Sequence, residues 1–94
     1  MSYDLAFLDS ALKEWRALDG AVRDQFKKKL AERLEQPRIS KDRLHGGDGN
    51  RYKIKLRAIG YRLVYEVRDA EVLVLVIAVG RHDGAQVCDR ANRR

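Results

Sequence analysis

Residues 51–68 read RYKIKLRAIGYRLVYEVR, and this stretch decides the fold class. Apolar and polar residues alternate on both sides of a turn at residues 58–60, which is the period of a β-strand with one buried face. The short turn favours antiparallel pairing of the two strands. One face of the pair then carries Tyr52, Ile54, Leu56, Tyr61, Leu63 and Tyr65, and the other carries basic side chains.

The segments on either side extend this pair into a sheet. Residues 72–79 are apolar on both faces, which is typical of a central strand, and a short turn at residues 69–70 favours an antiparallel meander. Residues 3–7 alternate as a short first strand would. Residues 84–94 are polar with weak helical character, so the sequence predicts one further helix at this end.

Two helices are expected between the first strand and the meander. The first runs from Asp9 or Ser10 to about Leu18, and Asp19-Gly20 breaks it. The second spans residues 21–35, where four apolar residues recur at every fourth position. We therefore expect one α+β domain over residues 1–94. It has a small antiparallel sheet, an N-terminal helical hairpin on one face and a short C-terminal helix, in the order β-α-α-β-β-β-α.

Composition and charge limit the function. The chain has 20 Lys and Arg against 14 Asp and Glu, giving a net charge of +6, which favours a polyanionic partner such as nucleic acid over a merely well-charged surface. Cys88 is the only cysteine, and His45 and His82 lie far apart, so we expect neither a disulfide nor a metal site. With no signal peptide and no membrane-length apolar run, we expect a cytoplasmic protein without a cofactor.

The basic face of the sheet is the candidate functional surface. Lys53, Lys55, Arg57 and Arg62 should share it, with strands about 5 Å apart. Cations at this spacing repel one another unless an anion lies between them, and a phosphodiester would serve. An ordinary solvated face, with Glu66 neutralising part of the charge, explains the pattern equally well. The residues alone leave these two interpretations open.

Several motifs resemble the RelE toxin family when they are taken in order. They are Ala11-Leu12-Lys13-Glu14-Trp15-Arg16, Phe26-Lys27-Lys28-Lys29-Leu30, Tyr52-Lys53-Ile54-Lys55-Leu56-Arg57, Gly60-Tyr61-Arg62-Leu63-Val64-Tyr65 and Val76-Ile77-Ala78-Val79-Gly80. The resemblance implies a metal-independent endoribonuclease that cuts mRNA in the ribosomal A site, using the RNA 2′-hydroxyl as nucleophile. It implies as partners a RelB-like antitoxin, the ribosome with its 16S rRNA, mRNA and, through the antitoxin, a DNA-bound repressor complex.

The resemblance also assigns roles to individual residues. Lys53 and Lys55 match the paired lysines that supply the base and positive charge, and Arg62 matches the arginine that stabilises the phosphate. The further candidate binding residues are Lys27, Lys28, Lys29, Arg57 and Cys88.

The chain departs from the family pattern near its end. Where the family carries a Lys-Arg or Arg-Arg pair, this chain has Arg81-His82, so either residue is a candidate general acid. Cys88 replaces a tyrosine and cannot stack on a base. Two alternatives are a ParE-like toxin that binds DNA gyrase without nuclease chemistry, and a plain RNA-binding domain. The second lacks an exposed aromatic platform.

Overall fold

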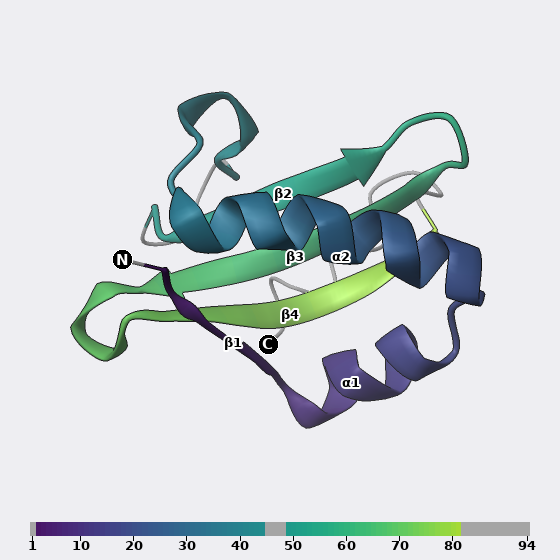
Figure 1. Ribbon diagram of the computed structural model, residues 1–94, viewed down its shortest axis with the longest axis horizontal. Helices are drawn as coiled ribbons and strands as arrows, with labels where there is room; N and C mark the ends of the chain where they lie inside the picture. The colour runs from purple at the N-terminus through teal and green to yellow at the C-terminus, as the bar shows by residue number, and fades with distance from the viewer. Residues whose placement is uncertain (1, 45–48, 82–94) are drawn as a thin grey trace.

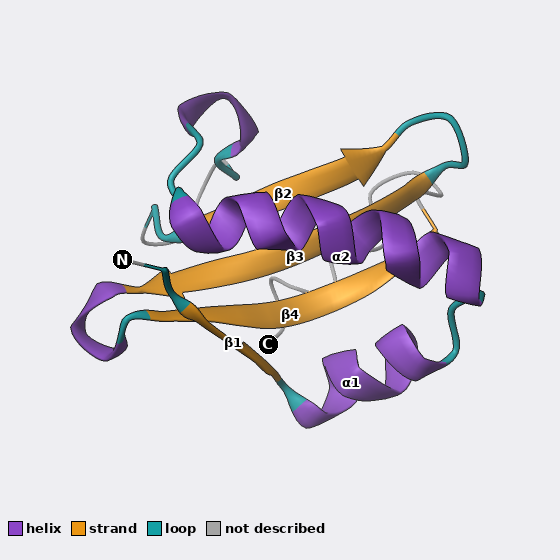
Figure 2. Ribbon diagram, viewed as in Figure 1, coloured by secondary structure: helices purple, strands orange, loops and turns teal. Residues whose placement is uncertain are grey.

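The computed structural model describes residues 2–44 and 49–81. The chain forms a four-stranded sheet with two helices on one face (Figures 1 and 2). The elements follow the predicted order, with two short 3₁₀ turns added: β1 (Asp4–Phe7), α1 (Asp9–Arg16), α2 (Gly20–Glu35), η1 (Ser40–Asp42), β2 (Arg51–Leu56), β3 (Tyr61–Arg68), η2 (Asp69–Glu71) and β4 (Leu73–Arg81). The expected C-terminal helix lies outside the described residues, as do His45, His82 and Cys88.

The strand order is β1-β4-β3-β2, and β2, β3 and β4 form the predicted antiparallel meander. The α+β class is confirmed, but the sheet is mixed rather than wholly antiparallel, because β1 pairs with β4 in parallel. The parallel pairing follows from the connection between β1 and β2, which consists of α1 and α2. The helical pair carries the chain from one edge of the sheet to the other, and such a crossover joins strands that run in the same direction. Three antiparallel strands then bring β4 back beside β1.

The main core lies between the helices and the sheet. Ala11, Val22, Phe26 and Leu30 project from the helices onto the alternate residues of β2 and β3 that were predicted to be buried. Phe7, Trp15 and Phe26 form a chain of tilted aromatic contacts, with ring centroids 5.2 and 6.3 Å apart. This packing confirms that the two helices cover one sheet face.

The opposite sheet face has its own smaller apolar cluster, made by Val64, Leu75, Ile77 and Ala78. Because β4 contributes to both clusters, its side chains are buried on both faces, as its uniformly apolar sequence predicted. Within the described residues, neither helix has the length and hydropathy needed to cross a membrane.

Candidate active site

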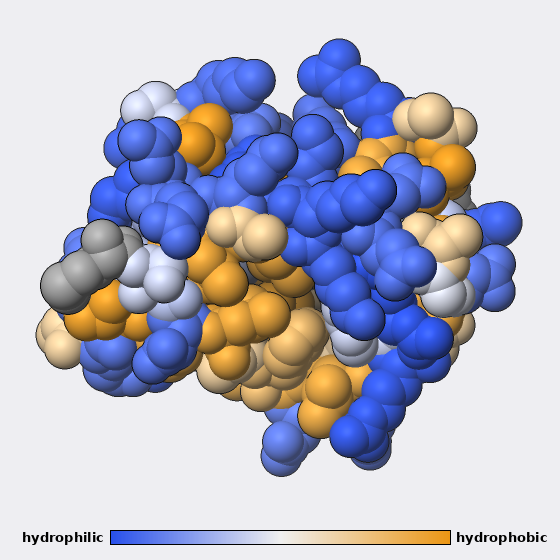
Figure 3. All heavy atoms as spheres, viewed as in Figure 1, coloured by the Kyte–Doolittle hydropathy of each residue, from blue (hydrophilic) through white to orange (hydrophobic). Residues whose placement is uncertain are grey.

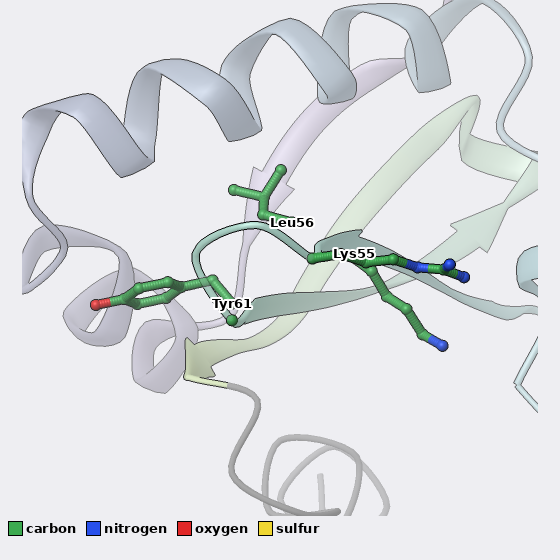
Figure 4. A pocket seen from close by; sticks show the side chains of 5 residues that line it. Lys55, Leu56 and Tyr61 are labelled. Carbon is green, nitrogen blue, oxygen red and sulfur yellow. The ribbon is translucent and has the colours of Figure 1, made fainter.

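The strand register brings three predicted site residues to one face. Lys55 lies directly opposite Arg62, and Lys53 lies opposite Val64, which belongs to the apolar cluster away from the helices. Figure 4 shows Leu56 pointing toward the helices while Lys55 points the other way. The predicted placement of Lys53, Lys55 and Arg62 is therefore confirmed, whereas their chemical roles remain to be tested. We call these three residues the cationic cluster.

The cations lower the pKa of Lys55. The largest cause is the charge of Lys53, followed by partial desolvation and then by the charge of Arg62, while Arg57 contributes least. Each neighbouring positive charge disfavours protonation of the Lys55 amine, so this lysine gives up its proton more easily than an isolated one. On the neighbouring strand β4, the residue paired with Arg62 is Gly80, which has no side chain to place over the cluster.

The other end of the same face, which we call the neutralised end, has its charges balanced within the fold. Glu66 accepts from Arg51 at 3.2 Å and from Arg68 at 2.8 Å, and Glu71 lies 3.9 Å from Arg68, so two carboxylates face two guanidinium groups. The sequence offered Glu66 as a counter-ion for part of the charge on the basic face, and in the structure its ion pairs lie at this end. In the described part of the chain, neither Lys53 nor Lys55 forms an ion pair with a carboxylate.

Arg81 lies apart from the cationic cluster. It pairs with Tyr61 at the end of β4, and its guanidinium carbon is 6.0 Å from the centroid of the Tyr61 ring. Tyr61 packs against the helix-side core, so Arg81 is held on that side of the sheet. A cavity of about 320 Å³ lies at the β2–β3 turn and is lined by Lys55, Leu56, Arg57, Gly60 and Tyr61 (Figure 4).

The three consecutive lysines of α2 do not form one site. Lys27 lines an apolar groove with Phe7 and Trp15, whereas Lys29 lines a polar cavity near β2 and Lys28 is exposed. The physical reason is that consecutive residues of a helix point about 100° apart. A run of like residues in the sequence therefore faces three different surroundings.

Arg33 positions the cluster, and sequence reasoning missed it. This largely buried side chain donates to Asp42 Oδ2 at 2.6 Å, to the Tyr65 hydroxyl at 2.9 Å and, more weakly, to the Lys53 carbonyl at 3.4 Å. The Tyr65 hydroxyl in turn donates to the Pro37 carbonyl at 2.6 Å. These bonds fix β2 beneath α2. The available signal was an arginine in the last turn of this helix, next to Leu34 of the apolar stripe.

Two further observations complete the chemistry of the site. Glu14 of α1 accepts a hydrogen bond from the Val79 amide at 3.3 Å, which ties α1 to β4 near the strand end. Among residues 2–44 and 49–81, no group of three His, Cys, Asp or Glu side chains is placed to hold a metal ion.

Comparison with known proteins defines the family. Residues 5–85 match the model of the ParE toxin of the type II toxin-antitoxin system parDE. The mRNA interferase toxin RelE of Escherichia coli K12 is 52% identical over 94 residues, covering 100% of this chain and 98% of that protein. A mutant of E. coli toxin RelE in the free state has a TM-score of 0.91 at 52% identity, covering 100% of this chain and 98% of that one. The toxin chain of the intact E. coli RelBE toxin-antitoxin complex has a TM-score of 0.84 at 54% identity, covering 88% of this chain and 100% of its own. The chain therefore belongs to the RelE family of toxins, within the wider superfamily that also includes ParE.

Proposed function

We propose that this protein is an mRNA interferase toxin, an endoribonuclease that cleaves mRNA in the ribosomal A site. The observation that supports this best is the cationic cluster, in which Lys55 and Arg62 face each other on the side of the sheet away from the helices, with Lys53 on the same strand as Lys55. A relative that is 52% identical over the full chain carries the name mRNA interferase toxin RelE. The proposed partners are mRNA and the ribosome with its 16S rRNA.

The reaction requires three chemical groups. A base takes the proton of the 2′-hydroxyl, the 2′-oxygen then attacks the adjacent phosphorus, and the bond to the 5′-oxygen breaks as that oxygen gains a proton. The products are a 2′,3′-cyclic phosphate and a 5′-hydroxyl. We assign the base to Lys55, because neighbouring cations lower its pKa, and we assign stabilisation of the phosphorane charge to Arg62 and Lys53. No step uses a metal ion.

We assign the general acid to His82 rather than Arg81. The assignment rests on Arg81, whose guanidinium lies over the Tyr61 ring on the other side of the sheet, and on the suitability of an imidazole as an acid near neutral pH. His82 itself lies outside the described residues. The expected result is a single-turnover cleavage rate that rises with pH and levels off at about pH 6 to 7.5, because loss of the His82 proton then offsets the gain in free Lys55 base. His82→Ala should abolish this levelling, and an arginine acid would give none, because a guanidinium keeps its proton throughout.

We also propose that a RelB-like antitoxin neutralises this toxin, and that the pair forms a DNA-bound repressor complex through the antitoxin. The support is the likeness to the toxin of the E. coli RelBE complex. Co-expression with the antitoxin reading frame should restore growth of cells that make the toxin. Continued toxicity in the presence of soluble antitoxin would contradict the assignment.

The match to the ParE family model supports one alternative, a toxin that inhibits DNA gyrase without cleaving RNA. A single experiment separates the two functions. The purified protein is added to an in vitro translation reaction, the mRNA 5′ ends are mapped, and gyrase supercoiling is measured in parallel. The nuclease assignment expects codon-spaced mRNA ends and normal supercoiling. Blocked supercoiling with intact mRNA would overturn it.

A further inference from the structure

A second group of cations lies at the edge of the sheet beside the C-terminal half of α2. A cavity of about 310 Å³ is bounded there by α2, η1 and β2, and we call it the edge cavity. Figure 1 shows η1 near the C-terminal end of α2, with β2 running alongside that helix. The edge cavity is lined by Ile54 and by the polar side chains of Lys29, Arg33, Lys41, Asp42, Lys55 and Arg57.

The charges of the edge cavity do not balance. Arg33 and Asp42 neutralise each other through an ion pair at 2.6 Å, and both are largely shielded from solvent, with 12% and 22% of their side chains exposed. Because Arg33 also donates to the Tyr65 hydroxyl, the Arg33–Asp42 ion pair is held in place at one side of the edge cavity. The remaining cations have no carboxylate partner in the part of the chain that the structure describes; they are Lys29, Lys41, Lys55 and Arg57.

The lining identifies the kind of ligand. A hollow surrounded by several donors and one buried aliphatic side chain, Ile54, suits a small polyoxygen anion such as a phosphate group. A protein partner is disfavoured, because charged residues are depleted at the centres of protein interfaces. The apolar surface that such a partner would prefer lies elsewhere, in the groove lined by Leu5, Phe7 and Trp15. Figure 3 shows this contrast, with hydrophilic side chains along α2 and an apolar area between α2 and α1.

The edge cavity is continuous with the cationic cluster. Lys55 belongs to both, and Arg57 contributes to the field that acts on Lys55. Phosphates recur along an RNA strand, so an RNA whose scissile phosphate lies between Lys55 and Arg62 carries other phosphates within reach of this edge. We propose that the edge cavity binds a second RNA phosphate, one that is not cut. The inference rests on the proposed function, and the phosphate belongs either to the mRNA or to ribosomal RNA.

The test uses the full-length toxin, purified ribosomes and a Lys29→Ala/Lys41→Ala variant. The matched control is Lys13→Ala/Arg16→Ala, which removes two exposed cations from α1. Single-turnover cleavage is followed as toxin concentration rises, and ribosome binding is measured separately by co-sedimentation. The edge variant should need more toxin for half-saturation and keep a maximal rate within about twofold of wild type, because it loses a binding contact made equally before and during the reaction.

Salt dependence identifies the lost contact as a phosphate. Each phosphate contact on a single strand contributes about 0.7 to the slope of log affinity against log salt. The advantage of wild type over the edge variant should therefore shrink about threefold between 50 and 200 mM salt. The control variant should keep the wild-type slope. Uncharged methylphosphonates at single positions of the mRNA then identify the source: one of them should remove the difference between wild type and variant if the mRNA supplies the phosphate, and none should if ribosomal RNA does.

Three results would overturn the proposal. The first is a half-saturating concentration and salt slope equal to those of wild type. The second is a lower maximal rate at unchanged half-saturation, which would place these lysines in the chemical step. The third is weaker binding to the antitoxin with unchanged binding to ribosomes. Failure of the proposed function is distinguishable, because wild-type toxin would then leave mRNA uncut while co-sedimentation still reports the edge cavity.

Discussion

The two ends of the basic sheet face have the same strands, the same alternation and the same kinds of side chain, yet different electrostatics. At one end, Glu66 holds Arg51 and Arg68 at 3.2 and 2.8 Å. At the other end, Lys55 and Arg62 face each other with Lys53 on the same strand, and the charges of Lys53 and Arg62 lower the pKa of Lys55. Net charge therefore does not identify a site, whereas the distribution of counter-ions over the face does.

The comparison distinguishes basic residues that stabilise the fold from those to which we assign a chemical role. The neutralised end has satisfied its charges inside the fold, so an incoming phosphate would have to compete with Glu66 there. Like charges directly opposite one another destabilise a sheet by several tenths of a kcal/mol, and an anion between them reverses that cost. The cationic cluster is therefore the end at which a phosphate gains most.

The largest expected effect comes from removing the arginine of the cationic cluster. Arg62→Ala should lower the single-turnover cleavage rate on ribosomes by about two to three orders of magnitude, because it removes one preorganised donor to the developing phosphorane charge. The rate is measured with toxin in excess over ribosomes, so that weaker binding does not contribute.

The control for this variant is an arginine of the neutralised end. Arg68 is exposed and already paired with Glu66, so Arg68→Ala should leave the rate within about twofold of wild type. Equal losses in the two variants would mean that the two ends do not differ in function. No loss in either would contradict the nuclease assignment itself.

Periodicity alone predicted which residues share a face. The alternation in residues 51–68 placed the tyrosines on the helix side, and the structure finds the Tyr52 and Tyr65 rings stacked there with centroids 5.7 Å apart. It also placed Lys53, Lys55 and Arg62 together, since a period of two leaves only two faces on which a side chain can lie. Local sequence was sufficient for these features because each depends only on neighbours along a strand and across a short turn.

Features that depend on distant parts of the chain were not predictable in this way. The parallel pairing of β1 with β4 follows from a crossover of two helices, and no local pattern in residues 3–7 reports it. The partners of Arg33 come from η1, β2 and β3, so its role appears only once these elements meet. The position of Arg81 was also not predictable from local sequence, because its contact with Tyr61 depends on where β4 ends relative to the β2–β3 turn.

A smaller effect should follow from breaking the neutralised end. Glu66 is only 14% exposed, and Glu66→Gln leaves Arg51 and Arg68 without the carboxylate that they share. We expect the free energy of unfolding to fall by about 1 kcal/mol, between the values for exposed and buried charged hydrogen bonds, as measured by urea denaturation. Glu71→Gln is the matched control, since Glu71 is 58% exposed and lies 3.9 Å from Arg68, and it should change stability by only a few tenths of a kcal/mol. A loss as large in the control would show that Glu66 has no special role.

The smallest effect concerns the electrostatics of the cationic cluster itself. The charge of Lys53 is the main cause of the lowered pKa of Lys55, so Lys53→Met should raise that pKa toward the ordinary value for lysine. Arg57→Gln should raise it less, because the charge of Arg57 is the weakest of the causes. The pKa is measured by NMR titration of the Lys55 side chain in the free toxin.

The direction of the pKa change also determines the effect on cleavage. Removing a neighbouring positive charge favours the protonated amine, so a smaller fraction of Lys55 is a free base at any given pH. In the His82→Ala background, where the Lys55 pKa sets the end of the rising limb, the pH at which cleavage stops increasing should then move upward in the same order, Lys53→Met more than Arg57→Gln. A Lys55 pKa that stays unchanged or falls in Lys53→Met would show that the two lysines do not act on each other, and the assignment of Lys55 as the base would lose its electrostatic support.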